Sequence, residues 1–184
     1  MLIKYLKRFK GQGIQSPPRH SFSWMLWSWV GAFFGILGAA VINRLLPLTP
    51  YDQVLLIGSF GASAVLIYGT PHAFYAQPRN LIGGHFISAI VGAWVMQSLD
   101  FPIPVLGAIS VATAIFFMHV SKTLHPPGGA TALIAVVGSD GVHQLGYWYI
   151  LQPVMSGAFM MLLVALMINN LSADPDRHYP KYWI

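Results

Sequence analysis

The chain has 184 residues, of which 55% are hydrophobic and only 8% are charged, and its formal net charge is +5. Soluble domains carry about a quarter charged residues, so this composition excludes an ordinary water-soluble domain and indicates an integral membrane protein. The length allows one domain, and the absence of cysteine excludes disulfide bonds and thiolate metal sites.

The N-terminal segment, residues 1–22, is basic. Such a cluster suits the anionic cytoplasmic face of a membrane better than nucleic acid, so we expect no nucleic-acid partner. A signal peptide would have an apolar core of only about 7–15 residues. The apolar run here continues to Leu46, which predicts a retained first helix. The basic residues before this run are Lys4, Lys7, Arg8, Lys10 and Arg19.

Six apolar segments follow in chain order: 24–46, 53–68, 80–99, 103–122, 129–138 and 153–171. The first, third, fourth and sixth are long enough to cross about 30 Å of hydrocarbon as helices, whereas the second and fifth are shorter. A polar tail, residues 172–184, comes last. The sequence therefore predicts an all-α integral membrane domain over residues 23–171, with a cytoplasmic segment on either side.

The fifth segment begins with a backbone-breaking motif, TLHPPGGATA at residues 123–132. Its two prolines remove backbone donors and push the residue before each out of helical geometry. The helix after them rises only about 16 Å, half a bilayer, and the extended residues 123–127 cover about the same distance. Loop and half-helix together would make one crossing, with the break near the bilayer midplane. The alternative is a re-entrant hairpin.

Loop charges favour six crossings. With a cytoplasmic N-terminus, six crossings place Arg79 and Lys122 inside, whereas four crossings with two re-entrant segments move both outside, against the positive-inside rule. We therefore expect both termini, including Arg177 and Lys181 of the tail, to be cytoplasmic. The residues expected on the far side are Arg44, Asp52, Asp100 and Asp140.

An internal repeat supports the same count. GASA at 61–64 matches GATA at 129–132, and a Gln-Pro pair follows each, at 77–78 and 152–153. A four-residue match is common by chance in a chain rich in alanine and glycine, but the recurring Gln-Pro favours a true repeat. The prediction is two inverted three-helix repeats, 23–99 and 102–171, of the kind found in many transporters.

In that plan, the second and fifth segments are half-helices that start near Gly61 and Gly129 and meet at the midplane. Helix N-termini offer unpaired N–H groups and a partial positive charge, which suit an anion. Small residues let the backbone approach a ligand closely. The predicted substrate-binding residues on these half-helices are Ser59, Gly61, Ser63, His125, Pro126, Pro127, Gly128, Gly129, Ala130 and Thr131.

Several candidates have two interpretations. His125 either faces the ligand and changes charge near neutral pH, or caps the helix break. Lys122 either attracts anions or extends to the membrane surface. Arg79 either contacts substrate or anchors a loop. His85 lies within a crossing, where ionisable side chains usually face the interior, and it either binds substrate or bridges helices.

The run HPPGGATAL at 125–133 resembles the signature of the HPP family of integral membrane proteins. Further matching stretches are GSFGASAVL at 58–66, AQPRNLIGGH at 76–85, NNL at 169–171 and YPKYW at 179–183. The resemblance implies transport of a small anion, because family members in cyanobacteria and plastids are associated with nitrite transport. It also implies a bacterial, cyanobacterial inner membrane. The family is often described with four membrane helices, so six segments depart from that description.

Three functional hypotheses follow. The first is transport of a small monovalent anion, nitrite above all, and the second is a channel for a small neutral solute. The third is a metalloenzyme that uses His72, His85, His119 and His125. No two of these histidines have i, i+3 or i+4 spacing and no interior carboxylate joins them, so we expect no enzymatic activity and no metal or cofactor. Glycines on the lateral apolar surface predict a homo-oligomer in the lipid bilayer.

Overall fold

The computed structural model of the chain describes residues 5, 6, 9, 15–44, 46 and 48–184. The basic residues on which the cytoplasmic N-terminus was predicted lie outside the described residues, with the exception of Arg19. These are Lys4, Lys7, Arg8 and Lys10.

Five helices in the described part of the chain are long and apolar enough to cross a membrane. They are α2 (Phe22–Asn43), α3 (Pro50–Ala64) continued by the π-helical turn η2 (Val65–Gly69), α4 (Pro78–Ser98), α5 (Ile103–Val120), and η4 (Ile150–Met155) continued by α8 (Ser156–Leu171). A shorter apolar helix, α6 (Pro126–Val137), precedes the short α7 (Asp140–Leu145). The all-α membrane fold predicted from the sequence is confirmed.

The helix starts follow local sequence rules. Thr49 caps α3, and its side chain and that of Asp52 form a reciprocal capping box. Pro50 and Pro78 occupy the first turns of α3 and α4, where a missing N–H costs nothing. α6 likewise begins at Pro126, three residues before the predicted start, because both prolines fit into its first turn.

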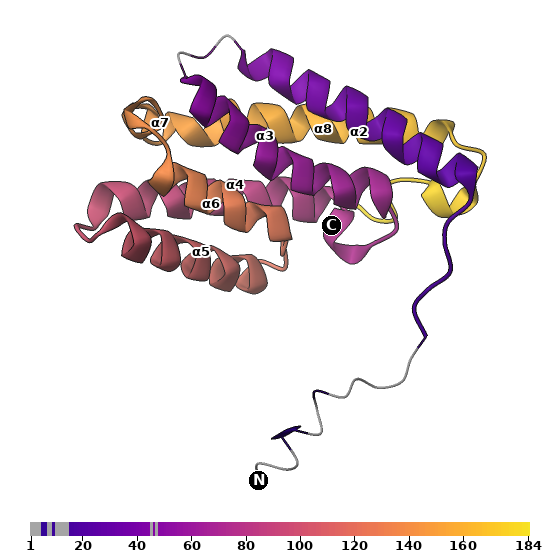
Figure 1. The fold of residues 1–184 in the computed structure, drawn as a ribbon, viewed down its shortest axis with the longest axis horizontal. Coiled ribbons are helices and arrows are strands. Elements are labelled where there is room, and N and C mark those ends of the chain that lie inside the picture. Colours follow the sequence, from indigo (N-terminus) through magenta and orange to yellow (C-terminus); the bar gives the residue numbers. More distant parts are fainter. Residues whose placement is uncertain (1–4, 7–8, 10–14, 45, 47) are drawn as a thin grey trace.

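Figure 1 shows the long helices side by side along the long axis of the molecule, with the short α6 between α3 and α5. Small residues bring α6 close to α4 as well. A Cβ atom on Gly92 would lie 2.6 Å from the carbonyl oxygen of Ala132, and one on Gly128 would lie 2.7 Å from Ser88 Oγ. The outer faces carry exposed apolar side chains such as Phe116, as a surface in contact with hydrocarbon requires.

The chain runs back and forth between two ends of this bundle. At the end that we call the Arg177 end, Arg177 donates to the carbonyl oxygens of Trp24 and Tyr68, which lie at the start of α2 and the end of η2. At the end that we call the Asp52 end, the carboxylate of Asp52 accepts a hydrogen bond from the backbone N–H of Ser139 at 2.9 Å. The described start of α2 and the C-terminal tail therefore lie at the same end.

The segment from Ser121 to Ser139 connects the two ends. Arg79, in the first turn of α4, donates to the carbonyl oxygen of Ser121 at 2.9 Å, which places Ser121 at the Arg177 end. Ser139 lies at the Asp52 end, beside Asp52. Extended loop and short helix together thus cross the bundle once, as the first of the two sequence-based alternatives required. A re-entrant hairpin would have returned to the Arg177 end.

The predicted half-helix near Gly61 is wrong. The helix continues from Pro50 through Gly61 to Gly69 and only changes to π geometry in its last turn. A glycine costs only about 1 kcal/mol inside a helix, and no proline interrupts the chain between Pro50 and Pro71. Of the two predicted half-helices only α6 is short, so two half-helices do not meet at the midplane. The inverted repeat stays a prediction.

Candidate functional site

Five polar side chains are buried together where α3, α4 and α6 meet. Each has an exposed fraction of 3% or less, and each lies in, or directly before, a helix whose outer face is apolar. Burying polar groups in such surroundings is costly unless each finds a hydrogen-bond partner. We call this group the His85–His125 cluster, and its members are Ser59, Ser63, His85, His125 and Thr131.

His85 of α4 occupies the centre of the cluster, with a partner at each ring nitrogen. Its Nε2 lies 2.8 Å from Ser63 Oγ, and its Nδ1 lies 2.8 Å from Thr131 Oγ1. Ser63 and Thr131 are the hydroxyl residues of the GASA and GATA sequences that suggested the internal repeat. These two similar sequences, on α3 and α6, therefore hold the same imidazole from opposite sides.

Ser63 also connects His85 to the second histidine. Ser63 Oγ lies 2.9 Å from His125 Nε2, and the two imidazole centroids are 5.0 Å apart. On the other side of the cluster, Thr131 Oγ1 lies 2.9 Å from Ser59 Oγ, which also lies 3.1 Å from the carbonyl oxygen of Pro127. The cluster is thus a continuous chain of hydrogen bonds across three helices.

The loop before α6 positions His125 beside α4. Its Nδ1 lies 2.8 Å from the carbonyl oxygen of Tyr75, and the side-chain amide of Asn80 donates to the carbonyl oxygen of Leu124 at 2.7 Å. A Cβ atom added to Gly84 would overlap with His125 Cβ. Gly84 lies in the second turn of α4, about 9 Å along the helix, so the break is nearer the Arg177 end than the predicted midplane.

The N-terminus of α6 offers fewer backbone donors than the sequence predicted. Pro126 and Pro127 have no N–H, and the N–H of Gly128 donates to the carbonyl oxygen of His125 at 2.8 Å. A typical helix start leaves four N–H groups free. The donors at this site are therefore chiefly side-chain hydroxyl and imidazole groups.

The remaining predicted residues lie at the edge of the cluster or away from it. Gly128 is buried against Ser88, and a Cβ atom on Gly129 would contact only Val111, at 3.7 Å. Ala130 is partly buried and Pro126 is exposed.

Three of the predicted binding residues are not brought into the cluster. Beyond its chain neighbours and the backbone of its own helix, nothing lies within 4 Å of a Cβ built on Gly61, so this glycine faces away from the site. Lys122 is exposed just after α5. Arg79 is partly buried and bonds the carbonyl oxygen of Ser121, which fits its interpretation as a loop anchor.

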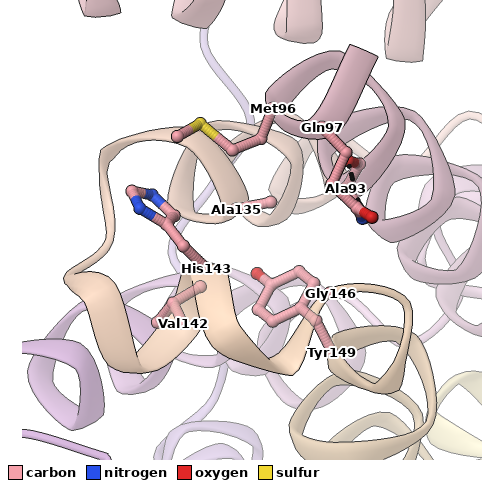
Figure 2. Close-up of a pocket in the computed structure, with 8 residues that line it drawn as sticks. All are labelled: Ala93, Met96, Gln97, Ala135, Val142, His143, Gly146 and Tyr149. Carbon is pink, nitrogen blue, oxygen red and sulfur yellow. Dashed lines mark hydrogen bonds between the residues drawn. The ribbon is translucent and has the colours of Figure 1, made fainter.

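Sequence reasoning missed Tyr149, whose hydroxyl donates to the carbonyl oxygen of Thr131 at 2.9 Å. Tyr149 also lines a cavity of about 10 Å³ near the Asp52 end, close to the smallest volume that holds one water molecule. Figure 2 shows this cavity, with His143 on α7, Tyr149 just after α7 and Gln97 on α4. Tyr149 has helical backbone angles at the start of η4. It lies between two of the apolar segments expected from the sequence, and no local pattern marks it.

The histidines of the metalloenzyme hypothesis do not gather. His72 and His119 are exposed and lie apart from the cluster. Among the residues that the structure describes, no group of three His, Cys, Asp or Glu side chains could hold a metal ion.

The hydrogen bonds predict one tautomer for each buried histidine. A carbonyl oxygen only accepts, so His125 carries its hydrogen on Nδ1, and its Nε2 accepts from Ser63. Ser63 then accepts from His85, which carries its hydrogen on Nε2. We expect ¹⁵N chemical shifts of imidazole-labelled protein at alkaline pH to show the Nδ1–H tautomer for His125 and the Nε2–H tautomer for His85. Each signal is assigned by its disappearance in His125→Gln or His85→Gln. Two histidines of the same tautomer would contradict this network.

Comparison with known proteins identifies relatives of the whole described domain. The family model described as "HPP, transmembrane region" matches residues 17–180. A transmembrane protein of Dictyostelium discoideum is 44% identical over 186 residues, which cover 99% of this chain and 64% of that protein. A second transmembrane protein of the same organism is 43% identical over 184 residues, covering 98% and 58%. The chain thus spans less than two thirds of these curated relatives, and no solved structure matches it.

Proposed function

The chain belongs to the HPP transmembrane family, as the HPPGGATAL run indicated, and on that premise we propose that it transports a small monovalent anion, such as nitrite, across the membrane. The observation that carries this proposal is the His85–His125 cluster. Its hydrogen bonds involve hydroxyl, imidazole and carbonyl groups and no carboxylate. Hydroxyl and N–H groups can turn toward an anion, whereas a carboxylate would repel it.

The positive charge at one end of the bundle also supports an anion as the substrate. Arg177 is fully buried at the Arg177 end, and its hydrogen bonds go to neutral groups. The partly buried Arg79 lies at this end too and also bonds a carbonyl oxygen. Positive charge near the entrance of a low-dielectric interior raises the local concentration of anions.

Burial of the cluster favours a gated carrier over an open pore. All five side chains are at most 3% exposed, so an anion reaches them only after the helices around them separate. The loop before α6 is one element that such a movement would involve, because it contains His125. A homo-oligomer, proposed from the glycines on the lateral surface, would supply a scaffold against which one element moves.

The anion proposal predicts selectivity by charge. In proteoliposomes, we expect uptake of nitrite, nitrate or formate to exceed that of a neutral solute of similar size, such as urea, by about tenfold or more, because the cluster binds through oriented donors. Protein-free vesicles give the background, which is needed because nitrous acid crosses lipid unaided. Equal uptake of urea and nitrate above background would favour the neutral-solute channel instead.

We also propose that the Arg177 end is cytoplasmic, following the positive-inside rule. The chain has no cysteine, so single cysteines can be labelled without background. Asp176→Cys and Asp140→Cys make a matched pair, since both positions are exposed and lie at opposite ends. We expect a membrane-impermeant maleimide to label Asp140→Cys from outside the cell and Asp176→Cys only after lysis. The reverse pattern would invert the orientation, and labelling of both from one side would contradict six crossings.

A further inference from the structure

We propose that the bridge His85–Ser63–His125 binds one proton and passes it between the two imidazoles, so that anion and proton cross the membrane together. The coupling of anion to proton rests on the proposed function. The proton site itself rests only on the arrangement of hydrogen bonds.

Without an added proton, every hydrogen bond of the chain points the same way. Since His125 Nδ1 donates to the carbonyl oxygen of Tyr75, its Nε2 accepts the hydrogen of Ser63. The backbone oxygen of Ser59, at 3.4 Å from Ser63 Oγ, is a more distant acceptor for the same hydrogen than His125 Nε2 at 2.9 Å. Ser63 in turn accepts from His85 Nε2, which leaves His85 Nδ1 to accept the hydrogen of Thr131.

This neutral arrangement leaves one bond incomplete. The hydroxyl of Thr131 has given its hydrogen to His85, so it accepts from Ser59. Ser59 has a single hydrogen and two neighbouring acceptors, Thr131 Oγ1 and the carbonyl oxygen of Pro127. In the neutral form of the hydrogen-bond network, the carbonyl oxygen of Pro127 therefore receives no hydrogen bond from Ser59.

One added proton satisfies all of these groups. If His85 is protonated at both nitrogens, it donates to Ser63 and to Thr131, and Ser63 still donates to His125. Thr131 is then free to donate to Ser59, and the hydroxyl of Ser59 turns to the carbonyl oxygen of the first turn of α6. The network thus has a place for one proton more than its neutral form.

The added proton has two positions, one on each imidazole. His85 Nε2–H breaks as a new O–H bond forms on Ser63, and the former O–H bond of Ser63 breaks as His125 Nε2–H forms. The donor and acceptor atoms are 2.8 and 2.9 Å apart, so neither step requires movement of heavy atoms. Charge moves from one imidazole to the other, no electrons are exchanged, and Ser63 is regenerated.

Among the residues that the structure describes, none supplies a fixed counter-ion to this proton. The titratable groups on the neighbouring elements have other partners or are exposed. A buried imidazolium without a negative partner is costly, and a monovalent anion bound beside it would supply that partner. Proton and anion would therefore enter the cluster together. These neighbouring groups are Tyr68 (bonded to Met161), Tyr149 (to Thr131), Tyr179 (to Ala76), Arg79 (to Ser121), the exposed His119 and Tyr75, and Asp52, which lies at the far end of α3.

The first experiment measures proton movement with anion transport. Proteoliposomes with an internal pH dye receive external sodium nitrate at zero membrane potential, clamped with potassium and valinomycin. We expect internal acidification with one proton per nitrate. The initial rate of acidification should fall by at least tenfold in Ser63→Ala and should be restored in Ser63→Thr. Ser110→Ala is the matched control, because Ser110 is also a buried serine with a bond to α6 and lies outside the bridge. Nitrate uptake without acidification would overturn the proton proposal and leave the anion proposal standing.

The second experiment decides the question even if no anion flux is found. In ¹⁵N-imidazole spectra of the purified protein, we expect His85 and His125 to take up a single proton between them as pH falls, with both signals shifting together. In Ser63→Ala the two signals should titrate separately. Shared titration without anion flux would support the proton site and contradict the proposed function. Independent titration in the wild type, or none before unfolding, would overturn the proton site.

Discussion

Replacing Arg177 with methionine is expected to lower the melting temperature of the detergent-solubilised protein by roughly 6–20 °C. The guanidinium is fully buried, lies 4.7 Å above the Trp24 ring, and donates to Trp24 O, Ser28 Oγ, Tyr68 O and Asn169 Oδ1. Each buried acceptor left unpaired costs about 1–3 kcal/mol. The carbonyl oxygen of Trp24 keeps Ser28 Oγ as a donor, so not every acceptor is left unpaired. We therefore expect a total loss of about 3–5 kcal/mol, together with loss of the main attachment of the tail to α2 and η2.

Arg44→Met is the matched control, because Arg44 is exposed at the end of α2 and should tolerate the change. Arg177→Lys should recover only part of the loss, since one ammonium group cannot reach acceptors on three helical segments. Burial lowers the pKa of Arg177 and the nearby Asp174 raises it, but a guanidinium stays charged in proteins. If Arg177→Met has the same melting temperature as the wild type, the tail is not a structural part of the bundle.

Gly84→Ala is expected to damage both stability and transport. The new Cβ atom would overlap with His125 Cβ and lie 2.9 Å from the backbone oxygen of Thr123, neither of which can move without moving the loop before α6. Overpacking of this kind costs about 1–3 kcal/mol. Because the same loop places His125 in the cluster, we expect initial anion flux in proteoliposomes to fall by about tenfold or more.

Gly61→Ala is the matched control for this change. Gly61 also lies inside a membrane helix, but nothing lies within 4 Å of its Cβ position, so alanine should stabilise the protein by up to about 1 kcal/mol and leave flux intact. The pair also tests the sequence-based prediction that Gly61 approaches substrate. A loss of anion flux in Gly61→Ala without a loss of stability would support the prediction that Gly61 lies beside the transported anion.

The membrane helices and the interruption before α6 followed from sequence alone. Hydrocarbon leaves no water to pair with the backbone, so an apolar run of sufficient length must be a helix whatever surrounds it. The prolines at 126 and 127 act locally as well, because each removes a donor and restricts its predecessor. The GASA and GATA sequences likewise place Ser63 and Thr131 among the residues predicted to bind substrate.

The contacts between these residues were decided by tertiary structure. Ser63 and Thr131 are 68 positions apart in the numbering, yet they hold the two nitrogens of His85, because α3, α4 and α6 pack at one level of the bundle. The sequence predicted a break at Gly61 by analogy with Gly129, but only proline lacks the N–H that helix continuation needs. The burial of Arg177 could not be predicted from the sequence either, because no local pattern distinguishes an exposed cation in a polar tail from a buried one. Local chemistry sets where helices begin and end, whereas partners distant in the chain are set by how those helices pack.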